Sequence, residues 1–398
     1  MRGSLTLEGT TGLARTTGRN DLMIQRAIVV GAGLIGTSIA LALRERGVEV
    51  ALGDPDAASL RLACDLGAGT VLDLDALDHP ADVAVVAAPP AAIPAVLRDL
   101  QDRGAAHVYT DCASVKDGVV TESARLGCDL ATYVPGHPMG GREKHGPSAA
   151  RADLFLGRSW ALCPTGKTDP GAVATTTELA RLCGAEPLTL DAATHDRAVA
   201  LISHAPHVAA SAVAARMIGG DDSALALAGQ GVRDVTRIAG GDPGMWLEIL
   251  RNNAAPVAEV LEGIATDLAA TARALRAAGD GTTETVHDLL ERGRRGHDRI
   301  PGKRGAQRVP DYAVLPVVIP DEPDSLGRLF AAVGAAGINI EDVRIDHSPG
   351  LPVGVAQLYV LPGAVTDLAR VLADQAGRCT PERADRAGPL WRGCTLFR

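Results

Sequence analysis

The stretch Arg26-Ala-Ile-Val-Val-Gly-Ala-Gly-Leu-Ile-Gly-Thr-Ser38 decides the fold of this chain. Residues 28–30 are an apolar, β-branched run that stops at a glycine, which is typical of a buried parallel strand. The glycines that follow have the spacing G-x-G-x-x-G: Gly31, Gly33 and Gly36. Residues 34–46 then show the pattern of a helix. The stretch therefore predicts a strand, a tight turn and a helix.

Each glycine of this pattern has a physical task in dinucleotide binding. Gly31 makes the turn, Gly33 lets the backbone approach a pyrophosphate, and Gly36 allows the helix to pack on the strand. The free N–H groups of the first helical turn, which begins at Leu34 and Ile35, lie at the positive end of the helix dipole. They are expected to hold the phosphates.

A second predicted strand, residues 48–53, ends at Asp54, which stands 18 residues after Gly36. A carboxylate at this place can accept hydrogen bonds from the adenosine ribose hydroxyls. It would also repel a 2′-phosphate, and neither Pro55 nor Asp56 can offset that charge. The pattern favours a nicotinamide dinucleotide over a flavin, and NAD over NADP. The alternative is an ordinary glycine-bearing turn that binds nothing.

Length and composition limit the kinds of protein this can be. A chain of 398 residues indicates about two or three domains. A net charge of -9 argues against a nucleic-acid or membrane-surface partner. We find no apolar stretch of the ~18 residues that a membrane span requires. The seven cysteines include no C-x-x-C pair, which favours reduced thiols in the cytoplasm.

The strand and helix patterns continue to alternate after Asp54. Helices are predicted over 56–66 and 94–103, and strands over 69–72, 81–88 and 107–110. Such repeated units predict an α/β fold with a doubly wound parallel sheet, whose ligands bind at the carboxyl ends of the strands. Those ends include Pro89, expected beside the cofactor, and the loop of residues 111–114, expected near the nicotinamide.

The rest of the chain divides into two further parts. From Ala172 the apolar residues take helical spacing, with helices predicted over 191–217, 223–239 and 243–275, so this part is expected to be all-helical. Beyond a Gly-, Arg- and Pro-rich linker comes a small unit with the order βαββα and a final strand that we do not place within 379–398. The predicted bounds are a disordered tail 1–22, a dinucleotide-binding domain 23–165, a helical domain 166–295, a linker 296–311 and the small domain 312–398.

One group of side chains is unusual for an acidic protein: Ser114, His137, Lys144, His204, His207, Arg233 and Arg237. His137 stands between a glycine and a proline, at the strand ends where the nicotinamide is expected. His204 and His207 are three residues apart and share one helix face, and Pro206 would break the hydrogen bonds of that helix and aim the pair. A zinc site is the alternative, but no H-E-x-x-H or cysteine pair accompanies these residues, so we predict no metal.

Several ordered motifs resemble those of the prephenate/arogenate dehydrogenases of tyrosine biosynthesis. They are Asp111-Cys-Ala-Ser-Val-Lys116, Gly136-His-Pro-Met-Gly-Gly-Arg-Glu-Lys144, Ser203-His-Ala-Pro-His207, Gly231-Val-Arg-Asp-Val-Thr-Arg-Ile-Ala239 and Asp242-Pro-Gly-Met-Trp246. The resemblance covers residues 24–295. It implies a Rossmann-type first domain and a helical domain like that of 6-phosphogluconate dehydrogenase, which intertwines into a homodimer. The implied reaction is the NAD-dependent oxidative decarboxylation of prephenate to 4-hydroxyphenylpyruvate.

The resemblance also implies roles for individual residues. His137 would accept the proton of the substrate hydroxyl, and Ser114 would orient its imidazole and touch the nicotinamide. Arg237 would bind a substrate carboxylate in a bidentate pair, oriented by Asp234. His207 would contact the substrate side chain, with His204 supporting it. Two further positions would have structural or gating roles only: Glu143 and Trp246.

The small C-terminal unit resembles an ACT domain, a βαββαβ amino-acid-sensing module. The motifs are Asp321-Glu-Pro-Asp-Ser-Leu326 and Gly337-Ile-Asn-Ile340. The resemblance implies that tyrosine binds at the loop before the helix that starts at Ser325, as an effector. The chain departs from the family at Asp324, where a glycine is usual. That carboxylate would repel an amino-acid carboxylate, unless it caps the helix. The alternative is a dimerisation module.

Three other functions stay open. Arogenate could replace prephenate and give tyrosine directly, although a basic pocket favours the keto acid. A 6-phosphogluconate or β-hydroxyacid dehydrogenase would need a catalytic lysine in the helical domain, and Arg251-Asn252-Asn253 offers none. A non-catalytic sensor of dinucleotides and amino acids would have no need of both His137 and Arg237.

Overall fold

The computed structural model describes residues 23–140, 146–277, 281–300, 312–347 and 352–376. The predicted tail 1–22, positions Glu143 and Lys144, and the final strand within 379–398 lie outside these residues, as does residue range 301–311 of the linker. The chain divides into two compact units between Ile264 and Ala265. Each unit is described by itself.

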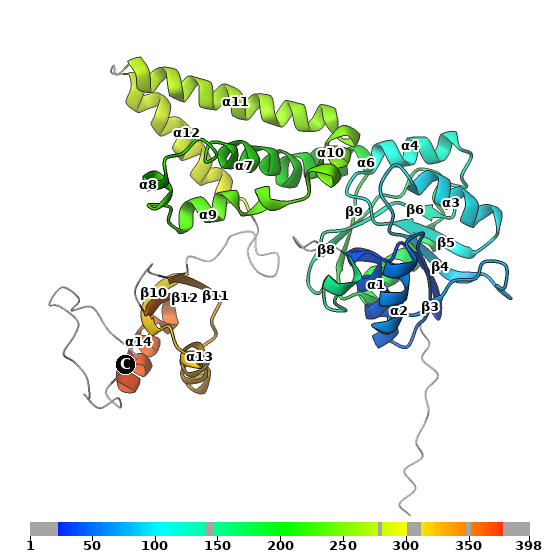
Figure 1. Cartoon of the computed structure of the whole chain (residues 1–398), viewed down its shortest axis with the longest axis horizontal. Helices are drawn as coiled ribbons and strands as arrows, with labels where there is room; N and C mark the ends of the chain where they lie inside the picture. Colours follow the sequence, from blue (N-terminus) through cyan, green and yellow to red (C-terminus); the bar gives the residue numbers. More distant parts are fainter. Residues whose placement is uncertain (1–22, 141–145, 278–280, 301–311, 348–351, 377–398) are drawn as a thin grey trace, which may run out of the picture. The chain divides into compact units, whose positions relative to one another are not determined.

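A six-stranded parallel sheet organises the first unit, as the repeated units predict (Figure 1). Its strands are β1 (Arg26–Val30), β2 (Glu49–Gly53), β3 (Thr70–Val71), β4 (Ala81–Val86), β5 (Ala106–Asp111) and β6 (Tyr133–Val134). Their order in the sheet is β3-β2-β1-β4-β5-β6, and every neighbouring pair is parallel. The chain therefore winds outward from β1 to one edge and then from β4 to the other. In such sheets the ligand crevice lies at the switch between β1 and β4.

Helices cover both faces of this sheet because successive side chains of a strand point to opposite faces. Val29 packs in one core with residues of α1 (Leu34–Glu45), α2 (Ala57–Asp65) and α5 (Pro170–Leu182). Ile28, the preceding residue, packs in the other core with residues of α3 (Ile93–Asp102) and α4 (Asp117–Arg125). The near-continuous apolar strands reflect this burial on both sides.

A second, three-stranded sheet follows, and sequence reasoning did not predict it. It contains β7 (Gly136–Pro138), β8 (Ser159–Leu162) and β9 (Glu186–Thr189), with β8 in the centre. Helix α5 and Ala185 belong to the hydrophobic core on the α1 side of the large sheet. Helix α5 and Ala185, which the sequence placed in the helical domain, therefore pack with the large sheet. The helical spacing of α5 identifies a helix but carries no information on the layer it packs against.

The helical part begins with a run that contains a local change of helix type. The elements are α6 (Ala192–Val199), a π-helical segment (Ala200–His204), α7 (Ala205–Ala215), α8 (Asp222–Leu225), α9 (Gln230–Thr236), a 3-10 turn (Arg237–Gly240), α10 (Pro243–Asn252), α11 (Ala254–Ala277) and α12 (Gly281–His297). The first three replace the single helix predicted over 191–217. Pro206 stands in the first turn of α7, directly after the π-helical segment.

One correction concerns this same run. Residues 192–215 are long and apolar enough, by length and composition, to cross a membrane, contrary to the estimate from sequence. One third of the apolar window is buried inside the protein. The run also carries His195, Asp196 and His204, which are buried and hydrogen-bonded to other elements. These bonds join the run to Lys116, His137 and Asn253 of the first unit.

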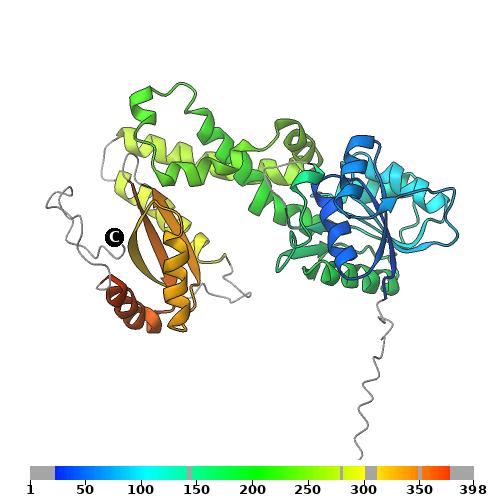
Figure 2. The same cartoon turned by 60° about the horizontal axis from the view of Figure 1, so that its bottom comes forward.

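The small domain in the second unit has the predicted element order. It consists of β10 (Ala313–Pro320), α13 (Ser325–Ala335), β11 (Asp342–His347), β12 (Val353–Val360) and α14 (Val365–Ala376). The strands form an antiparallel sheet with β12 in the centre (Figure 2). Alternate residues of β12, such as Ala356 and Leu358, pack against Leu329 of α13 and Leu368 of α14. Both helices therefore cover the same face of this sheet.

Candidate active site

The turn between β1 and α1 has the geometry that a dinucleotide requires. Gly31 adopts a φ of +111°, and a Cβ there would lie 2.3 Å from the carbonyl oxygen of Ala87. A Cβ on Gly36 would lie 1.9 Å from the carbonyl oxygen of Gly31, so only glycine fits. Gly33, in contrast, faces open space within 4 Å. The backbone is therefore open to a pyrophosphate at this one position.

Asp54 extends this cradle at the end of β2. Its Oδ2 accepts a hydrogen bond from the Ala32 N–H at 2.6 Å, and its Oδ1 accepts one from the Asp56 N–H at 2.7 Å. These bonds fix the carboxylate beside the glycine turn and leave lone pairs for ribose hydroxyls. Helix α1 starts at Leu34 without a side-chain cap, which leaves its first N–H groups for a phosphate. The residues present fit a bound dinucleotide.

A fully buried polar network lies at the end of β5 and beside β6. The Lys116 ammonium contacts the Asp111 carboxylate and donates to the carbonyl oxygen of Gly136 at 2.7 Å. The Tyr133 hydroxyl donates to Asp111 at 2.6 Å, and burial followed by the Asp111 charge raises the tyrosine pKa well above its usual range. Because these bonds join β5, β6 and β7, they fix the strand that carries His137.

His137 lies in β7, next to a histidine that sequence reasoning missed. Its Nδ1 is 2.9 Å from Nε2 of His195, and Nδ1 of His195 is 2.7 Å from the Asp196 carboxylate. Part of the His137 surface reaches solvent, yet the surrounding atoms desolvate the ring. That desolvation lowers the pKa of His137 well below 6.5, helped by charge on His195, Lys116 and His204. The imidazole of His137 is therefore neutral at neutral pH and can accept a proton.

His204 and His207 lie near the same place, on the run that carries His195. Asn253 joins Nδ1 of His204 at 3.1 Å to the backbone carbonyl of Asp196 at 2.8 Å. Burial lowers the pKa of His204 to about 4. His207 stacks on the ring of Trp246, with centroids 3.6 Å apart and planes at 12°, and burial lowers its pKa too. Trp246 thus holds the ring of His207, a contact the sequence did not predict.

The remaining predicted residues are less closely joined. Ser114 is half-buried in the loop after β5, and within the described residues no hydrogen bond joins it to His137, whose Nδ1 is bonded to His195 instead. Arg237 opens the 3-10 turn after α9 and is exposed, as is Arg233. Asp234, expected to orient Arg237, accepts a hydrogen bond from Gln230 at 2.8 Å. Pro89 lies exposed just beyond β4.

The residues missed from sequence each have at least one partner 20 or more positions away: Lys116, His195, Asp196 and Asn253. One signal could have revealed two of them. His195 and Asp196 are an adjacent polar pair in an Ala- and Val-rich helix that follows a separate N-cap, Asp191. Across the described ranges, no group of three or more histidine, cysteine or acidic side chains is arranged to hold a metal ion.

Comparisons with known proteins agree with this arrangement. The family domain described as "Prephenate dehydrogenase, nucleotide-binding domain" matches residues 39–188, and the one described as "Prephenate dehydrogenase, dimerization domain" matches residues 191–292. The "Probable prephenate dehydrogenase NovF" of Streptomyces niveus is 39% identical over 356 residues, which cover 88% of this chain and 98% of that protein. The prephenate dehydrogenase of Bacillus subtilis is 27% identical and covers 80% of this chain and 87% of its own.

Solved structures give the same result. The prephenate dehydrogenase of Aquifex aeolicus, in complex with hydroxyphenyl propionate and NAD+, has a TM-score of 0.60 at 26% identity and covers 68% of this chain and 98% of its own. The arogenate dehydrogenase of Synechocystis has a TM-score of 0.58 at 27% identity, with coverage of 69% and 99%. With both family domains matched in order and a relative 39% identical along nearly its whole length, the chain belongs to the prephenate dehydrogenase family.

Proposed function

We propose that the chain is a prephenate dehydrogenase that uses NAD to convert prephenate into 4-hydroxyphenylpyruvate and carbon dioxide. One observation carries this proposal above the others. A neutral histidine, His137, stands in β7, which Lys116 and Asp111 join to the end of β5 in the dinucleotide-binding sheet, and it lies close to the buried His204. A reaction in which a hydroxyl loses its proton as its carbon loses a hydride needs such a base.

The chain's own residues carry the proton through the reaction. His137 accepts the proton of the prephenate hydroxyl at Nε2 while the hydride leaves the same carbon. The NAD that binds to the Gly31–Gly36 turn supplies the hydride acceptor. The bond between the ring and its carboxylate then breaks and releases carbon dioxide. The electron pair of that bond enters the ring, which becomes aromatic as the new carbonyl oxygen becomes a phenolate. The proton on His137 can return to the phenolate oxygen, so the base is restored after each turnover.

We assign the binding of the substrate to the helical part. Arg237 pairs with a carboxylate, and His207, held by its stack on Trp246, contacts the substrate side chain. His204 supports this contact from its buried position, and Ser114 reaches the nicotinamide from the loop after β5. Because the carboxylate persists from ground state to transition state, Arg237→Gln should raise KM with a smaller effect on kcat. An Arg237→Lys control keeps the charge but loses the bidentate geometry.

Arogenate is the second candidate substrate, since the Synechocystis relative is an arogenate dehydrogenase with similar coverage. Arogenate carries an ammonium where prephenate has a keto group. The cationic side chains assigned to the site, Arg233 and Arg237, favour the substrate without that positive charge. NADH formation with each substrate, at matched concentrations, decides between them. A higher kcat/KM for prephenate supports our assignment, and a higher value for arogenate replaces it.

We further propose that the active form is a homodimer in the cytoplasm. Large apolar side chains are exposed along the helical part: Val213, Met217, Ile218, Leu225, Leu227 and Val235. Exposed apolar surface of this extent marks a contact with another chain, and the matched family domain is described as a dimerization domain. Analytical ultracentrifugation that gives the mass of a single chain, rather than the mass of two, would contradict the proposed homodimer.

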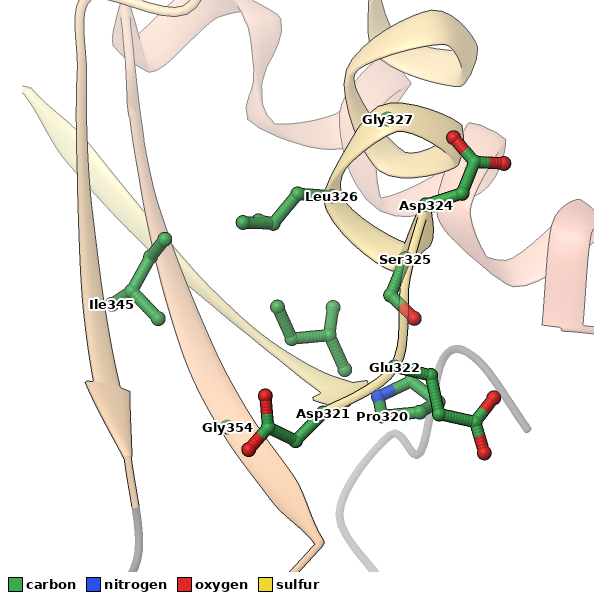
Figure 3. Close-up of a pocket in the computed structure, with 10 residues that line it drawn as sticks. Pro320, Asp321, Glu322, Asp324, Ser325, Leu326, Gly327, Ile345 and Gly354 are labelled. Atoms are coloured by element: carbon green, nitrogen blue, oxygen red, sulfur yellow. The ribbon is translucent and has the colours of Figure 1, made fainter.

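For the small domain we propose tyrosine as an effector, at a pocket of about 140 Å³ between the end of β10, the start of α13 and the other two strands. Figure 3 shows Leu326 and Ile345 facing each other across this pocket. The lining includes Asp321, Glu322 and Asp324 and no basic side chain. These carboxylates weaken binding of the amino-acid carboxylate. Removal of one of them, in Asp324→Gly, should therefore lower the Kd for tyrosine in calorimetric titration of the full chain.

A further inference from the structure

We propose that His195 and Asp196 are positioning residues that fix the tautomer of His137, so that its Nε2 is the proton acceptor. This inference rests on the proposed role of His137 as the base. It concerns two residues that have no predicted role in the sequence analysis. It follows from the order of donors and acceptors along three side chains that lie in one line of hydrogen bonds.

The carboxylate of Asp196 determines the first step of this order. A carboxylate only accepts hydrogen bonds, so the Nδ1 of His195 that lies 2.7 Å away must carry a hydrogen. In a neutral imidazole the other nitrogen then has a free lone pair. Nε2 of His195 is therefore an acceptor, and Nδ1 of His137 at 2.9 Å must be the donor. The lone pair of His137 is left on Nε2.

Asp196 is held firmly enough to impose this order. Its carboxylate accepts from the backbone N–H groups of Lys116 at 2.8 Å and of Asp117 at 2.9 Å, where α4 begins. These two backbone donors fix the position of the carboxylate at the start of α4. His195 and Asp196 are 2% and 4% exposed, so water cannot replace their bonds. The side-chain amide of Asn253, the residue after α10, donates a hydrogen bond to the backbone carbonyl oxygen of Asp196.

The same line of bonds helps His137 when it gains a proton. The imidazolium has hydrogens on both nitrogens, and its Nδ1–H still donates to His195. Behind it the Asp196 carboxylate offsets part of the new positive charge. The other charged or titratable groups around His137 are Lys116 with its partner Asp111, and His204. His195 itself, Lys116 and His204 oppose the protonated form, and the Asp196 carboxylate behind His195 offsets part of that opposition.

Two substitutions at His195 separate positioning from simple packing. His195→Gln places an amide oxygen near the former Nε2, so it can still accept from His137, whereas His195→Leu fills the space without an acceptor. We expect kcat of His195→Gln to stay within about 10-fold of wild type, and His195→Leu to lose a further ~10–100-fold, with KM changed little in both. Arg197→Gln, on the exposed side of α6, is the matched control. Equal kcat losses for the glutamine and leucine variants would overturn the proposal.

Asp196→Asn tests the direction of the bonds. With its amide oxygen in place of Oδ2, the asparagine still accepts from the Asp117 N–H. Its NH₂ then stands in place of Oδ1, where it loses the bond from the Lys116 N–H, donates to His195 and reverses both tautomers. We expect kcat to fall by ~10²–10⁴, as when the carboxylate of a catalytic triad becomes an amide. A kcat within a few-fold of wild type would count against the assignment.

Nitrogen NMR of histidine-labelled full-length protein gives a readout independent of turnover. In wild type, the proton of neutral His137 should reside on Nδ1, and in Asp196→Asn it should move to Nε2. A wild-type His137 with its proton on Nε2 would refute the inference even if prephenate is the substrate. Conversely, the predicted tautomers in a protein that oxidises neither prephenate nor arogenate would uphold the inference and reject the proposed function.

Discussion

At the scale of single residues, the environment of His137 changes what its titration is expected to do. An unperturbed histidine has a pKa near ~6.5, but burial lowers that of His137 well below this value. The base works only when neutral, so activity is lost on its protonation. We therefore expect kcat/KM to stay level as the pH falls through 6.5 and to drop only at lower pH. A drop centred above 6.5 in the pH profile would contradict this, and His137→Asn should lack the drop.

Asp54 governs the choice of dinucleotide at the same scale. Its carboxylate is fixed by the Ala32 and Asp56 N–H groups, so it cannot swing away from a 2′-phosphate. Like charges brought together in this way cost up to several kcal/mol. Asp54→Ser combined with Pro55→Arg should therefore raise the ratio of kcat/KM for NADP to that for NAD by at least ~10-fold. Wild-type protein that works better with NADP would show the assignment to be wrong.

At the scale of elements, sequence reasoning succeeded where the signal is local. The spacing of His204 and His207 predicted a helix that carries both, and a continuous helical run does carry them, with both side chains buried; their roles in the site stay a prediction. It failed for β7, predicted as a loop, because three residues with a glycine and a proline show no alternating pattern. It also missed His195, whose bond to His137 spans 58 residues. A contact of that kind leaves no periodic trace in either segment.

The turn between β10 and α13 provides a prediction at this scale. Asp324 has a φ of +68°, the only described non-glycine residue with a positive φ. The sequence suggested that it caps α13, but its side chain makes no capping hydrogen bond. A side chain in this conformation costs roughly 1–2 kcal/mol relative to glycine. In urea unfolding, Asp324→Gly should therefore be more stable than Asp324→Ala by about 1 kcal/mol; equal stability would mean the backbone there is unstrained.

At the scale of the whole molecule, the buried histidines link folding to pH. The pKa of His204 is about 4 in the folded protein, against ~6.5 when unfolded. Between these values the unfolded chain binds more protons, so the free energy of unfolding falls as the pH is lowered. Protonation of His204 alone should lower the free energy of unfolding by on the order of 3 kcal/mol between pH 7 and pH 4. Urea titrations from pH 7 to 4 should show this loss, and His204→Gln should reduce it; an unchanged slope in the variant would contradict the assignment.

The architecture of the molecule was predictable in large part, for a physical reason. Buried parallel strands and the G-x-G-x-x-G turn leave strong local patterns, so the doubly wound sheet follows from them. The place where the first domain ends does not follow from local patterns, because α5 has the same helical spacing whether it packs on the sheet or in a bundle. Only the packing of Leu179 against the sheet reveals its layer.

The central claim is that His137 is the base of a prephenate dehydrogenase, and one measurement tests it most directly. NADH, carbon dioxide and 4-hydroxyphenylpyruvate are quantified for wild type and His137→Asn with prephenate and NAD. We predict equal amounts of the three products in wild type, and a kcat lower by ~10²–10⁴ in the variant with KM little changed. Absence of NADH in wild type, or near-normal kcat in His137→Asn, would contradict the account.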